Sequence, residues 1–182
     1  MVQLEKTPLQ DCFILNTPTF TDDRGRFSET FNKRDFHKAT GLEIDFVQDN
    51  QSTSQFGVLR GLHYQRGDKA QAKLVRVIEG EVLDVVVDLR KDSLTYGKQF
   101  SMILSAANRK QLFVPKGFAH GFVTLSETSI FAYKCDQYYD KNSEGGIHYA
   151  DATLEIDWHL PHNRLIISEK DQQLPSFNEV NV

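Results

Sequence analysis

Two histidines in this 182-residue chain lie in strand-like segments whose other residues are typical of a protein interior. His63 lies in the segment Val58–Gln65, and His120 completes a Pro-x-Gly-x-x-His spacing that begins at Pro115. A neutral imidazole can accept a proton near pH 7, because its ordinary pKa is about 6.5. Taken alone, each histidine is more often a core residue whose ring is satisfied by a hydrogen bond.

Two further polar side chains interrupt strand faces that are otherwise apolar. Glu29 lies between Phe27 and Phe31 at strand spacing, and Tyr133 follows Phe131 on one face of a long strand-like run. Burying a polar group costs free energy unless the group is paired or used. From the pattern alone, the rim of a sheet explains Glu29 and core packing explains Tyr133 at least as well as chemistry does.

Arg60 and Lys73 are two cations placed within the same strand-like regions. Arg60 precedes His63 by three positions, so a regular strand would send these two side chains to opposite faces. A β-bulge at Gly61 would bring both to one face. Lys73 shares its parity with Val75 and Val77, which predicts that its amine points toward the interior rather than into water.

Short alternations of apolar residues, separated by turn residues, predict strands through most of the chain. The expected strands are Phe13–Leu15, Arg26–Asn32, Ile44–Gln48, Val58–Gln65, Lys73–Ile78, Leu83–Leu89, Phe100–Leu104, Gln111–Val114, Gly121–Leu125 and Thr128–Tyr138. Gly80 and Glu81 predict a tight hairpin between the fifth and sixth of these strands. The fold class is therefore all-β, and a jelly-roll β-barrel or sandwich is expected.

Helices are expected to be few, short and peripheral. Asn32 is a good N-cap for a helix over Lys33–Thr40, and Gly41 is a good residue to end it. A second short helix is expected to start at Ser168.

Composition excludes several classes of function. The net charge of −4 argues against a nucleic-acid partner, which usually requires a basic surface. Cys12 and Cys135 lie in unrelated contexts, which predicts two reduced thiols. No run approaches the roughly 20 apolar residues that cross a bilayer, and the first residues lack the apolar stretch of a signal peptide. We expect one domain over residues 1–182, in the cytoplasm, with no membrane partner.

The spacing at Pro115–His120 resembles the second motif of the cupin superfamily. The first cupin motif usually places two histidines one residue apart and a glutamate shortly after, and these side chains hold a metal. Here Gln65 stands at the position of the second histidine, and Lys73 lies near the position of the glutamate. An ammonium is a poor neighbour for a divalent cation. The resemblance therefore implies a cupin pocket with no metal and no cofactor.

Longer motifs resemble, in order, those of the dTDP-4-dehydrorhamnose 3,5-epimerase family over almost the whole chain. They are DxRGxFxExF from Asp23, FVQDN at 46–50, VLRGLHYQ at 58–65, KLVRVIEGEVLDVVVDLR at 73–90, VPKGFAHGFVTLSE at 114–127, Tyr133-Lys134, Tyr138-Tyr139, Ser143-Glu144-Gly145 and SEKDQQLP at 168–175. The resemblance implies an isomerase that converts dTDP-4-keto-6-deoxy-D-glucose into dTDP-4-keto-L-rhamnose through enolates, for dTDP-L-rhamnose biosynthesis.

The resemblance also implies roles for four catalytic residues. His63 is the base, and Asp171 orients it and stabilises its charged form. Tyr133 is the acid on the opposite face of the sugar, and Lys73 lies near the C4 oxygen. From spacing alone, Asp171 fits a capping interaction with Ser168 equally well.

The remaining positions that match the family bind the nucleotide sugar, and the family's homodimer implies that Arg24 or Glu29 contributes to the neighbour's site. The planar fork of arginine suits phosphate oxygens, and Tyr139 would stack on thymine. The expected binding residues are Arg24, Glu29, Gln48, Asp49, Asn50, Arg60, His120, Tyr139, Glu144 and Lys170.

Three alternative functions remain open at this point. A close relative of this activity would invert only one carbon or move the ketone along the ring. A binding module without catalysis would keep the residues that hold the nucleotide but would not need both His63 and Tyr133. A metal cupin oxygenase would contain iron or zinc in the purified protein.

Overall fold

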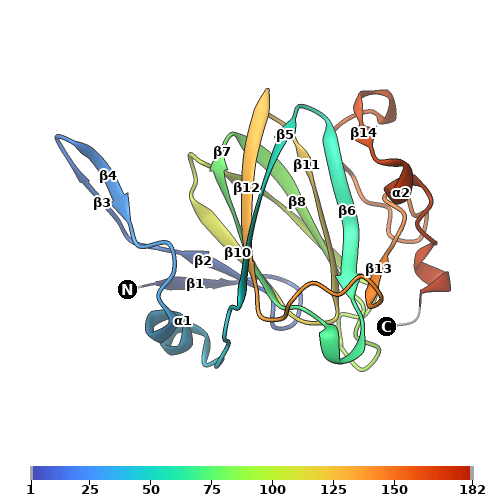
Figure 1. The fold of residues 1–182 in the computed structure, drawn as a ribbon, viewed down its shortest axis with the longest axis horizontal. Coiled ribbons are helices and arrows are strands. Elements are labelled where there is room, and N and C mark those ends of the chain that lie inside the picture. The colour runs from blue at the N-terminus through green and yellow to red at the C-terminus, as the bar shows by residue number, and fades with distance from the viewer. Residues whose placement is uncertain (1, 181–182) are drawn as a thin grey trace.

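Two β-sheets pack face to face in the computed structural model, which describes residues 2–180 (Figure 1). In hydrogen-bonding order, the first sheet contains β1 (Gln3–Lys6), β2 (Phe13–Asn16), β10 (Lys110–Val114), β7 (Lys73–Glu79), β12 (Thr128–Cys135) and β5 (Gln48–Gln55). The second sheet contains β13 (Glu144–Gly146), β6 (Val58–Gln65), β11 (Phe118–Thr124), β8 (Glu81–Asp88) and β9 (Gln99–Ser105), and β14 (Ile166–Ile167) pairs in parallel with β6. The expected all-β fold is confirmed, as a sandwich rather than a closed barrel.

The inner faces of the two sheets bury an apolar cluster between them. Val75 and Val77 come from the first sheet, and Val86 and Phe122 come from the second. These side chains are at most 5% exposed, and burying each one contributes on the order of 1.5–3 kcal/mol. The cluster fixes the distance between the sheets and therefore the width of any cavity that opens beside it.

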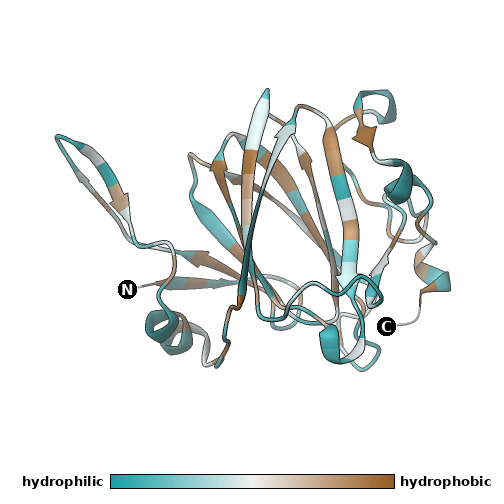
Figure 2. Ribbon diagram, in the orientation of Figure 1, coloured by the Kyte–Doolittle hydropathy of each residue, from teal (hydrophilic) through white to brown (hydrophobic). Residues whose placement is uncertain are grey.

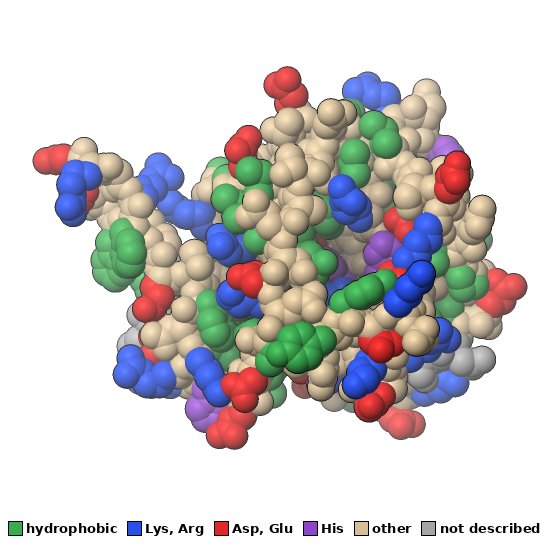
Figure 3. Space-filling model, in the orientation of Figure 1, with side chains coloured by type: hydrophobic (Ala, Val, Ile, Leu, Met, Phe, Trp, Pro, Cys, Tyr) green, Lys and Arg blue, Asp and Glu red, His purple; other side chains and the backbone are tan. Residues whose placement is uncertain are grey.

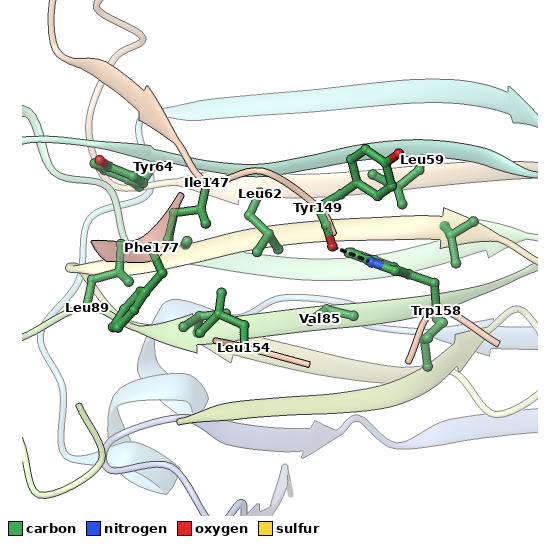
Figure 4. Close-up of a cluster of buried hydrophobic side chains, with 14 residues drawn as sticks. Leu59, Leu62, Tyr64, Val85, Leu89, Ile147, Tyr149, Leu154, Trp158 and Phe177 are labelled. Atoms are coloured by element: carbon green, nitrogen blue, oxygen red, sulfur yellow. Dashed lines mark hydrogen bonds between the residues drawn. The ribbon is translucent and has the colours of Figure 1, made fainter. Parts of the chain in front are cut away.

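Each sheet also has an apolar cluster on its outer face. The C-terminal part of the chain covers the second sheet, where the Trp158 ring N–H donates to the Tyr149 carbonyl over Leu62 and Val85 (Figure 4). On the first sheet, Phe36 of α1 (Lys33–Thr40) covers the outer face. Strands β8 and β11 carry many hydrophobic residues, whereas β5 is hydrophilic along its length (Figure 2).

The helices are short and peripheral, as expected. Helix α1 has the predicted bounds: Asn32 Oδ1 accepts from the Asp35 N–H at its start, and Gly41 ends it at φ +74°. Helix α2 (Glu169–Gln172) follows Ser168, whose hydroxyl accepts from the Asp171 N–H. Among the described residues, three 3-10 turns lie at Gly67–Lys69, His162–Arg164 and Phe177–Glu179. Within residues 2–180, no helix is both long and apolar enough to span a membrane.

The predicted hairpin at Gly80 is wrong. Strands β7 and β8 belong to different sheets, so the chain crosses from one sheet to the other at this glycine. Gly80 has φ +76°, and a Cβ there would lie 2.1 Å from the Thr128 carbonyl oxygen. An alternating pattern on both sides of a glycine is the same for a hairpin and for such a crossing, because both keep one face of each strand buried.

Several predicted strand bounds differ from the structure, including that of β11, which begins at Phe118 rather than Gly121. Strand β4 (Gly25–Ser28) ends before Asn32 and pairs with β3 (Thr19–Asp22) in a hairpin that projects from the sandwich (Figure 1). Ile44–Gln48 is not a strand except at Gln48, where β5 begins. Strand β12 ends at Cys135, before Tyr138.

Candidate active site

A cavity of about 560 Å³ opens between the two sheets. Its lining includes His63 and His120 from the second sheet, Lys73 and Tyr133 from the first, and Asp171 from α2. Figure 3 shows this hollow, with histidine side chains inside it and basic side chains at its edge. A second pocket of about 320 Å³ shares His63, Lys73 and Tyr133 with the first, so the two form one extended site.

A bulge in β6 turns Arg60 and His63 toward the same side. His63 pairs with His120 and Arg60 pairs with Phe122, so the intervening register gives β6 one residue more than β11. The strands approach closely here, because a Cβ on Gly61 would lie 2.5 Å from the Gly121 Cα. The predicted bulge at Gly61 is confirmed, and both side chains line the cavity.

His63 and Asp171 form a hydrogen-bonded pair across 108 positions of sequence. His63 Nε2 lies 2.7 Å from Asp171 Oδ1, and the Gly61 N–H donates to Oδ2 at 3.4 Å. Burial alone would raise the pKa of Asp171, but its hydrogen bonds to His63 and Gly61 hold that pKa below the ordinary value of 3.8. Since an ionised Asp171 accepts from Nε2–H, the lone pair of the neutral ring lies on Nδ1.

Tyr133 and Lys73 approach the same cavity from the first sheet. Burial raises the pKa of Tyr133 above its ordinary value of 10, which keeps the phenol protonated. Burial lowers the pKa of Lys73 below its ordinary value of 10.5, against weaker opposing effects from Cys135, Asp84 and Glu144. Lys73 Nζ lies 5.9 Å from the centroid of the Tyr133 ring. A proton donor and a cation therefore face a base that the opposite sheet supplies.

His120 forms a second pair with a carboxylate, which the sequence analysis did not single out. His120 Nε2 lies 2.9 Å from Asp84 Oδ2, and both side chains are buried. Asp84 Oδ1 has no hydrogen-bond partner among residues 2–180. The signal in the sequence is an aspartate within the apolar run Leu83–Leu89, where a buried charge requires a partner.

Several expected nucleotide-binding residues meet in the second pocket. Gln48, Asn50, Tyr139 and Glu144 line it. The Tyr139 hydroxyl donates to Glu144 Oε2 at 3.0 Å, and Lys170 Nζ lies 2.7 Å from the same oxygen. Burial would raise the pKa of Glu144, but these two contacts hold it below its ordinary value. Glu144 is therefore ionised and fixed at the edge of the pocket.

Three expected binding residues do not line either pocket within one chain. Arg24 pairs with Asp22 in the β3–β4 hairpin, where its side chain is 90% exposed. Glu29 lies beside a separate groove beneath that hairpin. Asp49 points away from the cavity and pairs with Lys134 at 2.7 Å. Its neighbours Gln48 and Asn50 face the pocket, since alternate strand residues point to opposite sides.

Polar residues of β5 add to the cavity, and the sequence analysis missed them. Ser52 lines it and has a buried hydroxyl without a hydrogen-bond partner in the described chain. Ser54 accepts from Arg60 Nε at 3.2 Å, which orients the guanidinium. The signal in the sequence is that positions 48, 50, 52 and 54 are all polar and would share one face of a strand. This pattern becomes informative only once the segment is known to be a strand.

Among residues 2–180, no three or more His, Cys, Asp or Glu side chains are grouped in a way that could hold a metal ion. At the position of the second cupin histidine, Gln65 uses its amide on main-chain atoms: Nε2 donates to the Lys69 carbonyl at 2.7 Å, and Oε1 accepts from the Asp140 N–H at 2.7 Å.

The chain is similar in sequence to a known protein family. Residues 6–179 match the profile of the family described as dTDP-4-dehydrorhamnose 3,5-epimerase. The chain is 47% identical over 180 residues to the protein of that name from Salmonella typhimurium strain LT2, which covers 98% of this chain and 97% of the relative.

Two solved structures are similar along their whole length. The dTDP-4-dehydrorhamnose 3,5-epimerase from Elizabethkingia anophelis NUHP1 superposes with a TM-score of 0.96 at 54% identity, covering 100% of this chain and 99% of that one. The dTDP-6-deoxy-D-glucose-3,5-epimerase from Legionella pneumophila Philadelphia 1, in complex with dTDP-4-keto-L-rhamnose, superposes with a TM-score of 0.95 at 44% identity, covering 100% and 95%.

Proposed function

Because the chain belongs to the dTDP-4-dehydrorhamnose 3,5-epimerase family and is an isomerase of dTDP-sugars, we propose that His63 and Tyr133 invert C3 and C5 of dTDP-4-keto-6-deoxy-D-glucose. The product is dTDP-4-keto-L-rhamnose, the ligand that the Legionella relative holds. The observation that carries the proposal is that these two side chains reach one cavity from opposite sheets.

The ketone at C4 makes the hydrogens at C3 and C5 acidic, so one pair of groups can serve both carbons. The lone pair on His63 Nδ1 takes the C–H proton, and the bonding electrons move to the C4 oxygen to form an enolate. The Tyr133 hydroxyl then gives its proton to the opposite face of the same carbon. Solvent restores the neutral imidazole and the phenol before the second carbon reacts.

Three neighbouring charges support these proton transfers. Asp171 holds the ring of His63 and stabilises its protonated form. The buried ammonium of Lys73 favours negative charge on the C4 oxygen, and a preorganised charge of this kind is worth on the order of 10²–10³ in rate. The positive charge of Arg60 lowers the pKa of Tyr133, in opposition to burial, and so stabilises the phenolate after transfer.

The nucleotide part of the substrate would lie along the extended site. Arg60 and the Ser52 hydroxyl, which has no hydrogen-bond partner among the described residues, suit the diphosphate, and His120 is held toward the same cavity by Asp84. In the second pocket, Gln48 and Asn50 carry the donors and acceptors that can read thymine edges. Tyr139 supplies a ring for stacking, beside Glu144 and Lys170.

We further propose that the protein is a homodimer in which the β3–β4 hairpin of one subunit completes the site of the other. Two observations support this arrangement. Arg24 and Glu29 lie outside the cavity of their own chain, and Phe20 and Phe27 of the hairpin are 63% and 67% exposed. Exposed aromatic rings on a projecting hairpin are typical of a surface that another chain covers.

The proposal also includes the domain organisation and the cellular location of the protein. We treat residues 1–182 as one domain, because the outer apolar clusters pack on strands of the same two sheets. The buried thiols of Cys12 and Cys135, which form no disulfide with each other, suit the reducing conditions of the cytoplasm.

Isotope exchange tests the proposed reaction directly. Incubation with dTDP-4-keto-6-deoxy-D-glucose in heavy water should introduce deuterium at both C3 and C5, read by NMR. His63→Ala should abolish exchange, whereas Tyr133→Phe should keep exchange and lose inversion at one or both carbons. Tyr96→Phe, at a residue outside both pockets, controls for the loss of a hydroxyl. Deuterium at a single carbon would reduce the proposal to a mono-epimerase.

A further inference from the structure

Glutamine side chains hold the main chain of residues 137–140, the segment that carries Tyr139. The Gln71 amide donates to the Gln137 carbonyl at 2.8 Å. Gln65 Nε2 donates to the Tyr138 carbonyl at 3.2 Å, and Gln65 Oε1 accepts from the Asp140 N–H at 2.7 Å. Gln48 Oε1 accepts from the Tyr139 N–H at 2.8 Å. We call Gln48, Gln65 and Gln71 the glutamine clamp.

The clamp replaces the strand pairing that ends just before this segment. The Asp136 N–H still bonds the Ala72 carbonyl, but beyond it the main-chain partners of Gln137, Tyr138 and Tyr139 are side-chain amides. Tyr138 and Tyr139 are 66% and 56% exposed, so packing contributes little to the position of their side chains. The place of the Tyr139 ring therefore depends on the amide hydrogen bonds beneath it, together with the bond from its hydroxyl to Glu144.

The clamp also ties the segment to both sheets. Gln48 begins β5 in the first sheet, and Gln65 ends β6 in the second, two residues after His63. Gln65 is only 5% exposed and makes one further bond, to the Lys69 carbonyl, which fixes the loop that follows β6. A rigid path of two residues therefore joins the proposed base to the wall of the nucleotide pocket.

A neutral amide is suited to this position for a simple chemical reason. Gln65 faces two carbonyls and one N–H, so it must donate twice and accept once. A carboxylate could not donate, and an ammonium could not accept. An added negative charge would also lie beside a pocket proposed to hold a nucleoside diphosphate.

We propose that Gln65 and Gln71 are positioning residues that, with Gln48, set the affinity for the nucleotide by fixing the Tyr139 segment. The inference rests on the proposed function, since it takes the second pocket as the nucleotide's place. The three clamp residues line the second pocket and not the first cavity, so loss of the clamp should act on binding and leave proton transfer intact.

The test compares Gln65→Met and Gln71→Met with a matched control. Asn108 also makes three amide hydrogen bonds to main-chain atoms, at the turn after β9, and it lines neither pocket. Gln65→Met should raise the Kd for dTDP, measured by calorimetry, and KM by about tenfold, with kcat within about threefold. Gln71→Met should raise the Kd and KM as well, but by a smaller factor. Asn108→Leu should leave Kd and KM unchanged.

Hydrogen exchange supplies a readout at the segment itself. The amides of Tyr139 and Asp140 should exchange faster in Gln65→Met, while in Asn108→Leu the increase should be confined to residues 105–110. If Gln65→Met does not fold, Gln71→Met decides, because it removes a single bond outside the strands. Unchanged Kd with faster exchange, or a loss confined to kcat, overturns the inference. A wild-type protein that binds dTDP but exchanges no substrate hydrogen would instead overturn the proposed function.

Discussion

Lys73 is the side chain whose burial has the clearest consequence for rate. Its ammonium can stabilise an enolate only while protonated, and burial lowers its pKa below 10.5. We therefore expect kcat to fall as the pH rises through that lowered pKa, before Tyr133 ionises, since burial raises the pKa of Tyr133 above 10. The measurement is kcat against pH on the alkaline side.

Lys73→Met tests whether the alkaline fall in kcat is due to Lys73. It should lower kcat by about 10²–10³ and remove the alkaline limb, because the titrating charge is gone. If the limb persists unchanged in Lys73→Met, it belongs to Tyr133 or another group. The Kd for dTDP should stay near the wild-type value, which separates a loss of charge from a loss of fold.

At this scale, the sequence identified His63, Tyr133 and Lys73 through their place in recognisable motifs, and the structure brings all three into one cavity. It did not identify Asp84 or Ser52 as part of the site. An isolated aspartate or serine in a strand acquires meaning only from its partner across the sheet. Asp84 pairs with Phe122 on the neighbouring strand, and its contact with His120 depends on side-chain directions that spacing does not specify.

Most elements follow from the sequence where hydrophobic residues alternate, although Ile44–Gln48 alternates and is a strand only at Gln48. They do not follow where polar residues alternate. Strand β6 has the predicted bounds, because its apolar residues are flanked by turn residues. Strand β5 reads Gln-Asp-Asn-Gln-Ser-Thr-Ser-Gln and carries no apolar side chain to indicate a strand. Its inward residues face a cavity instead of a core, so the property that makes β5 functional also hides it from the pattern.

The bulge in β6 gives a prediction that belongs to the elements. Gly61→Ala places a Cβ 2.5 Å from the Gly121 Cα and also occupies φ +128°. Gly25→Ala occupies nearly the same φ, +126°, with nothing within 4 Å of its Cβ. We expect Gly25→Ala to cost about 1 kcal/mol of unfolding free energy, and Gly61→Ala to cost at least about 2 kcal/mol more.

Urea unfolding of both variants measures the difference. The excess cost of Gly61→Ala reports the close approach of β6 and β11, because the matched φ cancels. Equal costs would mean that the strands can separate without penalty. In that case the bulge would not be what holds Arg60 and His63 on one side.

At the scale of the whole molecule, the projecting β3–β4 hairpin leads us to predict that each active site is built from two subunits. If Arg24 acts in the neighbour's cavity, then His63→Ala and Arg24→Ala subunits should complement each other. A mixed dimer has one site in which both changes meet and one site in which both residues are intact. After refolding the two variants together in equal amounts, about one quarter of all sites should be active.

The readout is epimerisation by the mixture compared with each variant alone. Activity no greater than the average of the separate variants would place Arg24 in its own chain's function, or in none. Sedimentation of each variant confirms that both still assemble, so that a failure of mixing is recognised. The sequence could not settle this point, because Arg24 lies outside the cavity of its own chain and spacing does not specify how two copies would pack.

The bond between His63 and Asp171 spans 108 residues, so its two halves leave the ribosome at different times. At 5–20 residues per second, the imidazole waits about 5–20 s for its carboxylate. Every strand of the two sheets except β14 is already synthesised during that interval, since β13 ends at Gly146 and only β14, α2 and two 3-10 turns follow in the described chain. A nascent chain can therefore build its sandwich before it has an oriented base, and translation itself delays the onset of catalysis until the last part of the chain arrives.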